Sequence, residues 1–153
     1  MTVRFASETS LSTTPAEAFD LSLSVAAHLA SMAGSRERAL GHDSSHVLAL
    51  GDEITWTAWH FGWKWRLTSR ITAFERPYRF VDEQVRGPFH RFRHEHLFEP
   101  DTQGTRMTDV VEFEAPAGWA GRIAERLVLG SYLRRLIERR NRYLASQLGR
   151  SRP

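Results

Sequence analysis

A run of alternating segments between Asp52 and Ala115 constrains the fold more than any other feature. Apolar and polar residues alternate with a period of two, which is typical of strands with one buried face. The segments are joined by short stretches rich in Pro, Gly and Asp, such as Pro100–Gly104. Short turns between consecutive strands indicate an antiparallel meander. The predicted strands are Asp52–Phe61, Trp63–Phe74, Arg79–Arg86, His90–Glu99 and Thr105–Ala115.

The residues before this run predict one further strand and a short helical pair. Val3–Leu11 alternates weakly and is expected to form the first strand. Thr14, Pro15 and Glu17 then form the signature of a capping box with proline at the first helical position. Helical spacing continues to about Met32, and the polar stretch from Gly34 to Ser45 is expected to be a loop.

The residues after the run predict one long helix. Pro116 ends the sheet, and helical periodicity continues to Leu148. Gly130 and Ser131 leave open a kink or a separate short first helix. The apolar side is expected to hold Trp119, Ile123, Leu127, Leu133, Ile137, Leu144 and Leu148.

These elements define an α+β fold in one domain, residues 1–150. A curved antiparallel sheet of about seven strands must cover one face, and the long C-terminal helix is the element able to do so. Two short helices follow the first strand. A sheet wrapped around a helix commonly leaves a cavity between the two.

Composition excludes several classes of function. The chain has no cysteine among its 153 residues, which excludes disulfides, thiolate catalysis and thiolate metal sites. No apolar run is long enough to span a bilayer, and no signal peptide is recognised, so we expect a cytoplasmic location without stable membrane insertion. We expect no resident cofactor or metal. No feature of the sequence fixes an oligomeric state.

Basic charge is concentrated near the C-terminus. The net charge is +3, yet nine Arg face only two Glu from Trp119 onward. Such a helix could bind an acidic partner through Arg134, Arg135, Arg139 and Arg142. Without a motif that reads nucleic acid, we favour a solvated outer face and predict no nucleic-acid partner.

Several stretches together resemble the SRPBCC superfamily, which includes START lipid-transfer domains and birch-pollen-allergen-like proteins. They are "LGDEITWTAWHFG", "SRITAFERPYRFVDEQVRGPF", "RHEHLFE" and "TDVVEFEAP". The likeness is greatest to small bacterial proteins of the polyketide cyclase/dehydrase-like or cell-division-inhibitor-like group. It implies a helix-grip fold with a deep, mostly apolar cavity under the C-terminal helix. It implies no particular reaction.

Alternation and turn geometry predict which side chains face that cavity. His90, Phe92, His94, His96 and Phe98 share one face of their strand. A turn between Thr102 and Gln103 places His96 opposite Asp109, Phe98 opposite Met107, His94 opposite Val111 and Phe92 opposite Phe113. The preceding turn places Phe80, Asp82 and Gln84 opposite His96, His94 and Phe92. We therefore expect two pairs, Asp82–His94 and His96–Asp109.

Three interpretations of this polar cluster remain open. His94 and His96, with Asp109 as a third ligand, could bind a metal, although His-x-His alone is a weak signal. His–carboxylate pairs could act as general bases in an aldol cyclisation or a dehydration. They could also satisfy one another while they orient the polar end of a ligand, which is the interpretation we prefer.

We therefore predict that the chain binds a small hydrophobic or amphipathic molecule. The alternatives are a cyclase/dehydratase-type enzyme that uses the same inward His and Asp residues, and a partner-binding protein whose cavity is filled by side chains. The predicted ligand-binding residues are Trp56, Trp65, Phe80, Gln84, Phe92, His94, His96, Phe98, Asp109, Val111, Phe113, Leu133 and Ile137.

Overall fold

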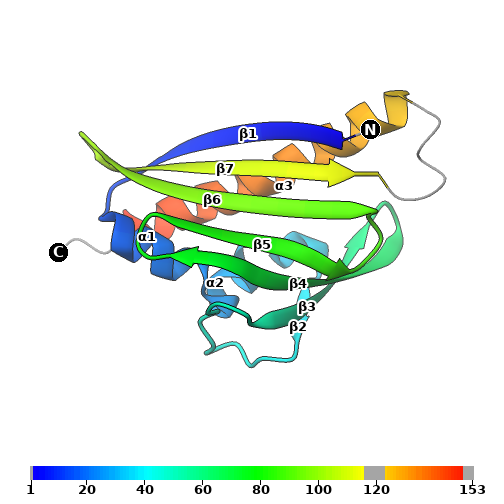
Figure 1. Cartoon of the computed structure of the whole chain (residues 1–153), viewed down its shortest axis with the longest axis horizontal. Helices are drawn as coiled ribbons and strands as arrows, with labels where there is room; N and C mark the ends of the chain where they lie inside the picture. Colours follow the sequence, from blue (N-terminus) through cyan, green and yellow to red (C-terminus); the bar gives the residue numbers. More distant parts are fainter. Residues whose placement is uncertain (1, 116–122, 150–153) are drawn as a thin grey trace.

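The computed structural model describes residues 2–115 and 123–149 of the chain, and the side chains of 123–126 are not described. Seven strands, two short helices, a 3-10 turn and one long helix make up this part (Figure 1). In chain order the elements are β1 (Thr2–Leu11), α1 (Pro15–Ser22), α2 (Val25–Ser31), η1 (Ala33–Ser35), β2 (Arg38–Leu40), β3 (Glu53–His60), β4 (Trp63–Glu75), β5 (Arg79–Arg86), β6 (Arg91–Asp101), β7 (Gly104–Glu114) and α3 (Ile123–Leu148).

The strands form one antiparallel sheet in the order β1-β7-β6-β5-β4-β3-β2. Every strand from β2 to β7 pairs with its neighbour in sequence, and β1 closes the other edge against β7. Helix α3 lies along one face of the curved sheet, and α1 and α2 pack on the same side (Figure 1). The predicted fold class, a sheet gripping a C-terminal helix, is confirmed.

The start of α1 follows directly from its sequence. The Thr14 hydroxyl accepts a hydrogen bond from the Glu17 amide at 3.3 Å, and the Glu17 carboxylate accepts one from the Thr14 amide at 3.2 Å. This reciprocal capping box satisfies two amide groups that the first helical turn leaves free. It places Phe19 on the buried side of α1.

The β6–β7 hairpin sets the register of the site. Gly104 has φ of 135°, and a Cβ there would lie 2.6 Å from the Leu11 carbonyl oxygen. Only glycine accommodates both the backbone angle and this close approach. The resulting register pairs His96 with Asp109, Phe98 with Met107, His94 with Val111 and Phe92 with Phe113, as predicted.

Of the two possibilities left open at Gly130 and Ser131, a separate short first helix does not form within the described part, because α3 continues through both residues. Two expectations about the elements were wrong. Strand β2 lies within the stretch assigned to a loop. Leu127, expected on the apolar side of the helix, is 65% exposed. Trp119 lies outside the described residues, so its predicted place on that side stays a prediction.

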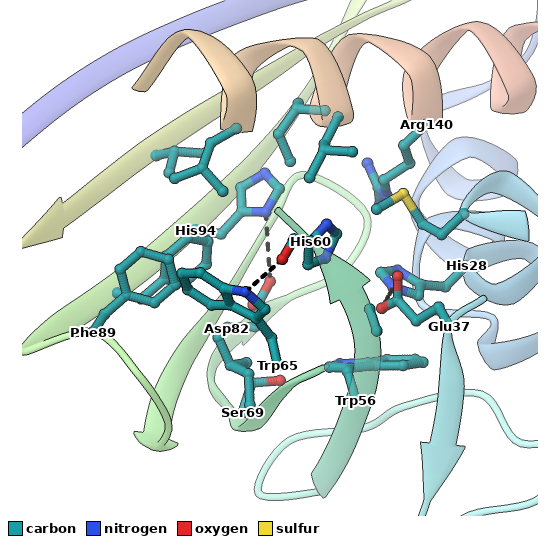
Figure 2. Close-up of a pocket in the computed structure, with 18 of the residues that line it drawn as sticks. His28, Glu37, Trp56, His60, Trp65, Ser69, Asp82, Phe89, His94 and Arg140 are labelled. Carbon is teal, nitrogen blue, oxygen red and sulfur yellow. Dashed lines mark hydrogen bonds and ion pairs between the residues drawn. The ribbon is translucent and has the colours of Figure 1, made fainter. Parts of the chain in front are cut away.

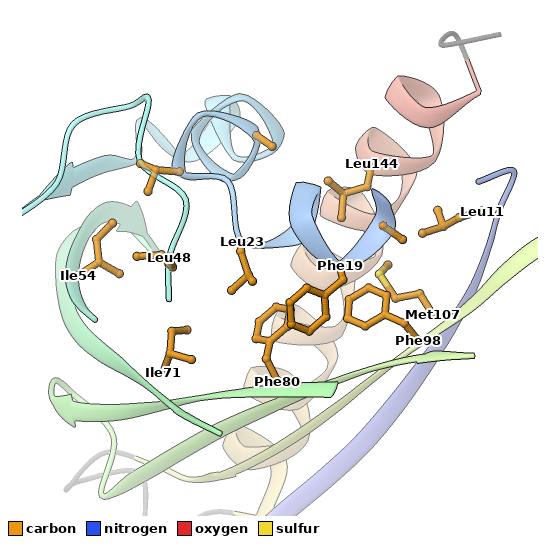
Figure 3. Packing of buried hydrophobic residues seen from close by; sticks show 13 residues of the cluster. Leu11, Phe19, Leu23, Leu48, Ile54, Ile71, Phe80, Phe98, Met107 and Leu144 are labelled. Carbon is orange, nitrogen blue, oxygen red and sulfur yellow. The ribbon is translucent and has the colours of Figure 1, made fainter. Parts of the chain in front are cut away.

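The buried apolar side chains form two clusters rather than one. The larger cluster packs α1, α2 and the end of α3 against the sheet, with Phe19 in edge contact with Phe80 and Phe98 (Figure 3). Phe19 also makes an edge contact with Phe74. The second cluster contains Phe5, Phe89, Val111, Phe113, Ala115 and Leu129. The lining of a cavity includes side chains of both clusters.

No helix in residues 2–115 and 123–149 is both long enough and apolar enough to cross a membrane.

Candidate functional site

A cavity of about 190 Å³ lies between the sheet and α3 (Figure 2). One water needs only about 10–15 Å³, so the cavity has room for a small organic molecule. Its lining is mostly apolar, with a few polar groups that converge on it. The alternative in which side chains fill this space is therefore not supported.

Nine of the predicted ligand-binding residues line the cavity, and four do not. The lining includes Trp56, Trp65, Phe80, Phe92, His94, His96, Val111, Leu133 and Ile137. Gln84, Phe98, Asp109 and Phe113 are not part of it. Phe98 and Phe113 are fully buried members of the two apolar clusters and stand behind the lining.

Gln84 holds a turn instead of facing the cavity. Its Nε2 donates to the Phe89 carbonyl oxygen at 2.7 Å, and its Oε1 accepts from the Phe89 amide at 3.3 Å. The β5–β6 register pairs Phe80 with His96 and Asp82 with His94, as predicted, and its last pair is Glu83 with Arg93. Gln84 thus fixes Phe89, and Phe89 itself lines the cavity.

The histidines and aspartates are bonded across the diagonals of the sheet. His94 Nε2 lies 2.7 Å from Asp109 Oδ1, and His96 Nε2 lies 2.9 Å from Asp82 Oδ2. The residues directly opposite were expected to pair, but Asp82 and His94 approach only to 4.0 Å. Diagonal neighbours on adjacent strands remain within reach of a ring as long as imidazole.

One contact in this cluster is close without being a hydrogen bond. His96 Nδ1 lies 3.1 Å from Asp109 Oδ1 but lacks hydrogen-bond geometry, so this buried nitrogen has no hydrogen-bond partner within residues 2–115 and 123–149. The His96 ring is held in place by stacking on Phe80 at 4.1 Å and by the His94 ring at 3.8 Å.

Helix α3 supplies two polar residues that the sequence did not indicate. Asn141 Nδ2 donates to Asp109 Oδ2 at 2.6 Å. Arg140 Nη1 donates to the Asn141 side-chain oxygen at 3.1 Å and lies 3.6 Å from Asp109 Oδ1. Both residues are buried, although Arg140 belongs to the Arg-rich helix that was expected to face solvent. Their spacing from Leu133, Ile137 and Leu144 is the signal that places them on the inner face.

Burial and electrostatic contacts set the protonation of this cluster. Burial alone would raise the pKa of Asp109, but its interactions with His94 and His96 outweigh burial and hold that pKa well below its usual range. Burial would also raise the pKa of Asp82, but its bond with His96 and its electrostatic contacts, including that with Arg140, outweigh burial and lower that pKa. Burial, followed by the charge of His96, lowers the pKa of His94. His94 is therefore a neutral imidazole near pH 7.

This protonation gives His94 a defined chemical capacity. Its Nε2 carries the proton that Asp109 accepts, so Nδ1 is the ring nitrogen with a lone pair, and Asp82 Oδ2 lies 4.0 Å from it. A neutral imidazole oriented by a carboxylate can accept a proton or a hydrogen bond from a bound molecule.

A second polar group lies on another part of the cavity wall, where α2 meets the start of β2. His28 Nε2 lies 2.7 Å from Glu37 Oε1, and the His28 ring lies against Trp56 with centroids 4.0 Å apart (Figure 2). Nearby on β3, His60 Nδ1 is 2.8 Å from the Tyr132 hydroxyl, and burial lowers the pKa of His60. None of these residues except Trp56 was among the predicted ligand-binding residues.

Two groups of side chains in the described residues have the spacing to hold a metal ion. Asp82, His94 and His96 offer ligand atoms within 4.8 Å of one another inside the cavity. His42, His46 and Asp52 do so in the loop between β2 and β3. The first group differs from the predicted one, because Asp82 rather than Asp109 completes it. Each group offers only three ligands, and structural zinc sites usually have four.

Solved structures share this architecture along nearly the whole chain. The aromatase/cyclase Zhui from Streptomyces sp. R1128 has a TM-score of 0.76 at 13% identity, covering 98% of this chain and 95% of its own. The helix-grip fold is shared. TTHA0849 from Thermus thermophilus has a TM-score of 0.73 at 16% identity and covers 97% of each chain. Ara h 8.0201 has a TM-score of 0.67 at 12% identity, and the match covers 95% of this chain and 99% of that protein.

These likenesses extend to the helix-grip fold and not to a particular activity. No family model matches the sequence, and no curated protein matches it either. Sequence identities of 10–18% among the similar structures show a common fold alone. The function therefore has to be argued from the cavity itself.

Proposed function

We propose that this protein binds one small, predominantly apolar molecule in the cavity between the sheet and α3. The observation that carries the proposal is the cavity, an open space of about 190 Å³ in an otherwise packed interior. Packed cores rarely leave voids of this size, because unfilled space forfeits dispersion contacts. A cavity lined by aromatic and aliphatic groups with a few convergent polar groups is typical of ligand sites.

The two parts of the lining have separate roles. Trp56, Trp65 and Phe92, with Leu133 and Ile137 from α3, supply apolar contact to a flat or compact ligand. Its polar end is oriented by His94, His96, Asp82 and Arg140. The remaining predicted residues act from behind the lining: Asp109 orients His94, Gln84 positions Phe89, and Phe98 and Phe113 support the wall.

Native mass spectrometry of the freshly purified protein, followed by denaturing extraction, is the direct test. We expect a co-purified small molecule that is released on unfolding, or a raised melting temperature with members of a lipophile panel. Leu133→Arg, which places a charge on the cavity wall, should abolish both signals. Leu127→Arg on the exposed side of the same helix is the matched control. A clean apo mass without any thermal shift would contradict the proposal.

A second candidate function is an enzyme of the cyclase/dehydratase kind. It is favoured by the neutral His94 imidazole held by Asp109, together with the shared fold of an aromatase/cyclase. In such a reaction His94 Nδ1 would remove a proton next to a carbonyl, and the resulting enolate carbon would attack a second carbonyl. Turnover of a linear poly-β-carbonyl compound that is lost in His94→Gln, with ligand binding retained, would distinguish this function from binding alone.

A further inference from the structure

Glu37 places a buried carboxyl group on the cavity wall with one oxygen unused. Its side chain is 7% exposed and lines the cavity (Figure 2). Oε1 is bonded to His28 Nε2 at 2.7 Å, whereas Oε2 is buried and has no hydrogen-bond partner among the residues that the structure describes. Buried polar atoms are nearly always paired, because an unpaired one has lost its water without replacement.

The position of Glu37 is fixed, so the side chain cannot easily turn to find a partner. His28, which holds Oε1, is itself packed against the Trp56 ring at 4.0 Å. Trp56 belongs to the central part of β3 and is paired with Leu67 of β4. These contacts hold the Glu37 carboxyl group in a rigid part of the cavity wall, as in sites that are formed before the ligand arrives.

The charges around the cavity favour one kind of ligand. Glu37 and Asp82 are acidic lining residues, and the Asp109 carboxyl group lies directly behind His94. Arg140 is the only Arg or Lys among the described lining residues, and it is already engaged with Asn141 and Asp109. Four His also line the cavity, but each is already bonded to a side chain of the protein: His28 to Glu37, His60 to Tyr132, His94 to Asp109 and His96 to Asp82. A ligand with its own carboxylate would therefore lie near two acidic side chains without a free cation among the described lining residues, which is unfavourable at low dielectric.

We propose that Glu37 Oε2 accepts a hydrogen bond from a hydroxyl or amino group of the ligand, so that the cavity selects donor-bearing, non-anionic molecules. This inference rests on the proposed binding function and names the ligand class that the site takes. The ligand then contacts two polar positions, Glu37 and the cluster around His94, with apolar lining elsewhere.

Displacement of 1-aminoanthracene fluorescence by three matched competitors tests the inference. Naphthalen-2-ol has a donor, 2-methoxynaphthalene keeps the oxygen without the donor, and 2-naphthoate carries a carboxylate. We expect naphthalen-2-ol to bind about tenfold more tightly than 2-methoxynaphthalene, as for a hydrogen bond to a charged acceptor. The weakest competitor should be 2-naphthoate.

The variant Glu37→Gln assigns this preference to the residue. Its amide oxygen can still accept from His28, while an NH₂ group replaces Oε2. The advantage of naphthalen-2-ol should disappear, and 2-methoxynaphthalene should bind at least as tightly as before. Glu8→Gln, an exposed carboxyl group on β1, makes the same charge change and should leave all three affinities unchanged. Circular dichroism and melting temperature check that both variants fold.

The outcomes separate this inference from the function on which it rests. If the reporter does not bind the native protein and no competitor raises its melting temperature, both are overturned. If the reporter binds and the three competitors displace it with equal affinity, the proposed ligand class is contradicted, whereas the proposed binding function is supported. If Glu37→Gln does not fold, the ranking of the competitors on the native protein decides alone.

Discussion

At the scale of single residues, Asp109 holds the polar cluster together. Its two carboxylate oxygens accept hydrogen bonds from His94 and Asn141, and it is fully buried. Asp109→Asn keeps the shape but removes the charge that this network is built around. We expect the free energy of unfolding at pH 7 to fall by about 3 kcal/mol, as when one partner of a buried charged pair is removed. Urea denaturation measures it.

The lowered pKa of Asp109 determines how this loss of stability depends on pH. The pKa of Asp109 in the folded protein is lower than the value of about 3.9 in an unfolded chain. Its contribution is therefore complete above about pH 4 and is lost as the pH falls through the folded-state pKa. The difference in free energy of unfolding between the native protein and Asp109→Asn should stay constant from pH 7 to 5 and become smaller at pH 3. Asp101→Asn in the β6–β7 turn should change stability by less than about 0.5 kcal/mol.

The histidines of this site could be predicted from the sequence because side chains in a strand alternate strictly between its two faces. Alternation placed His94 and His96 on the inner face, and the length of the hairpin loop fixed their partners on β7. The period does not say which neighbouring side chains bond, because both direct and diagonal neighbours lie within reach. Glu37 was missed for a different reason: it lies in a short segment without periodicity.

At the scale of elements, α3 shows how two leucines of one helix differ. Leu144 is 2% exposed and packs in the larger apolar cluster, whereas Leu127 is 65% exposed. Leu144→Ala should lower the free energy of unfolding by about 2–5 kcal/mol, through lost burial and the cavity left behind. Leu127→Ala should change it by less than about 0.5 kcal/mol. Equal losses in chemical denaturation would contradict this assignment of the helix face.

The faces of α3 were harder to predict than those of the strands. An apolar stripe identifies an inner face only while that face is apolar, and here Arg140 and Asn141 interrupt it. On β4 a shift of register between Ile71 and Ala73 disturbs the alternation, and Phe74 rather than Ala73 contacts Phe19. Such irregularities are set by neighbouring elements and leave no periodic signal.

At the scale of the whole molecule, the open cavity is expected to favour ligand binding and to lower the stability of the fold. It shares side chains with both apolar clusters, so filling it would join the two parts of the interior. Ala58 is buried on β3 and lines the cavity. We expect Ala58→Leu to raise the free energy of unfolding by about 1 kcal/mol, as cavity-filling changes commonly do. The same variant should lose its affinity for 1-aminoanthracene.

Measuring both quantities on one variant makes this prediction specific to the cavity. Ala6→Leu, at an exposed position of β1, adds the same side chain outside the cavity and should leave both quantities unchanged. A tightly packed site without spare volume would instead be destabilised by Ala58→Leu, because the added carbons would force strain. Loss of stability with unchanged reporter binding would therefore mean that the space beside Ala58 is not the ligand site. A gain in stability with loss of binding would mean that the open cavity is maintained at the expense of stability because the ligand requires it.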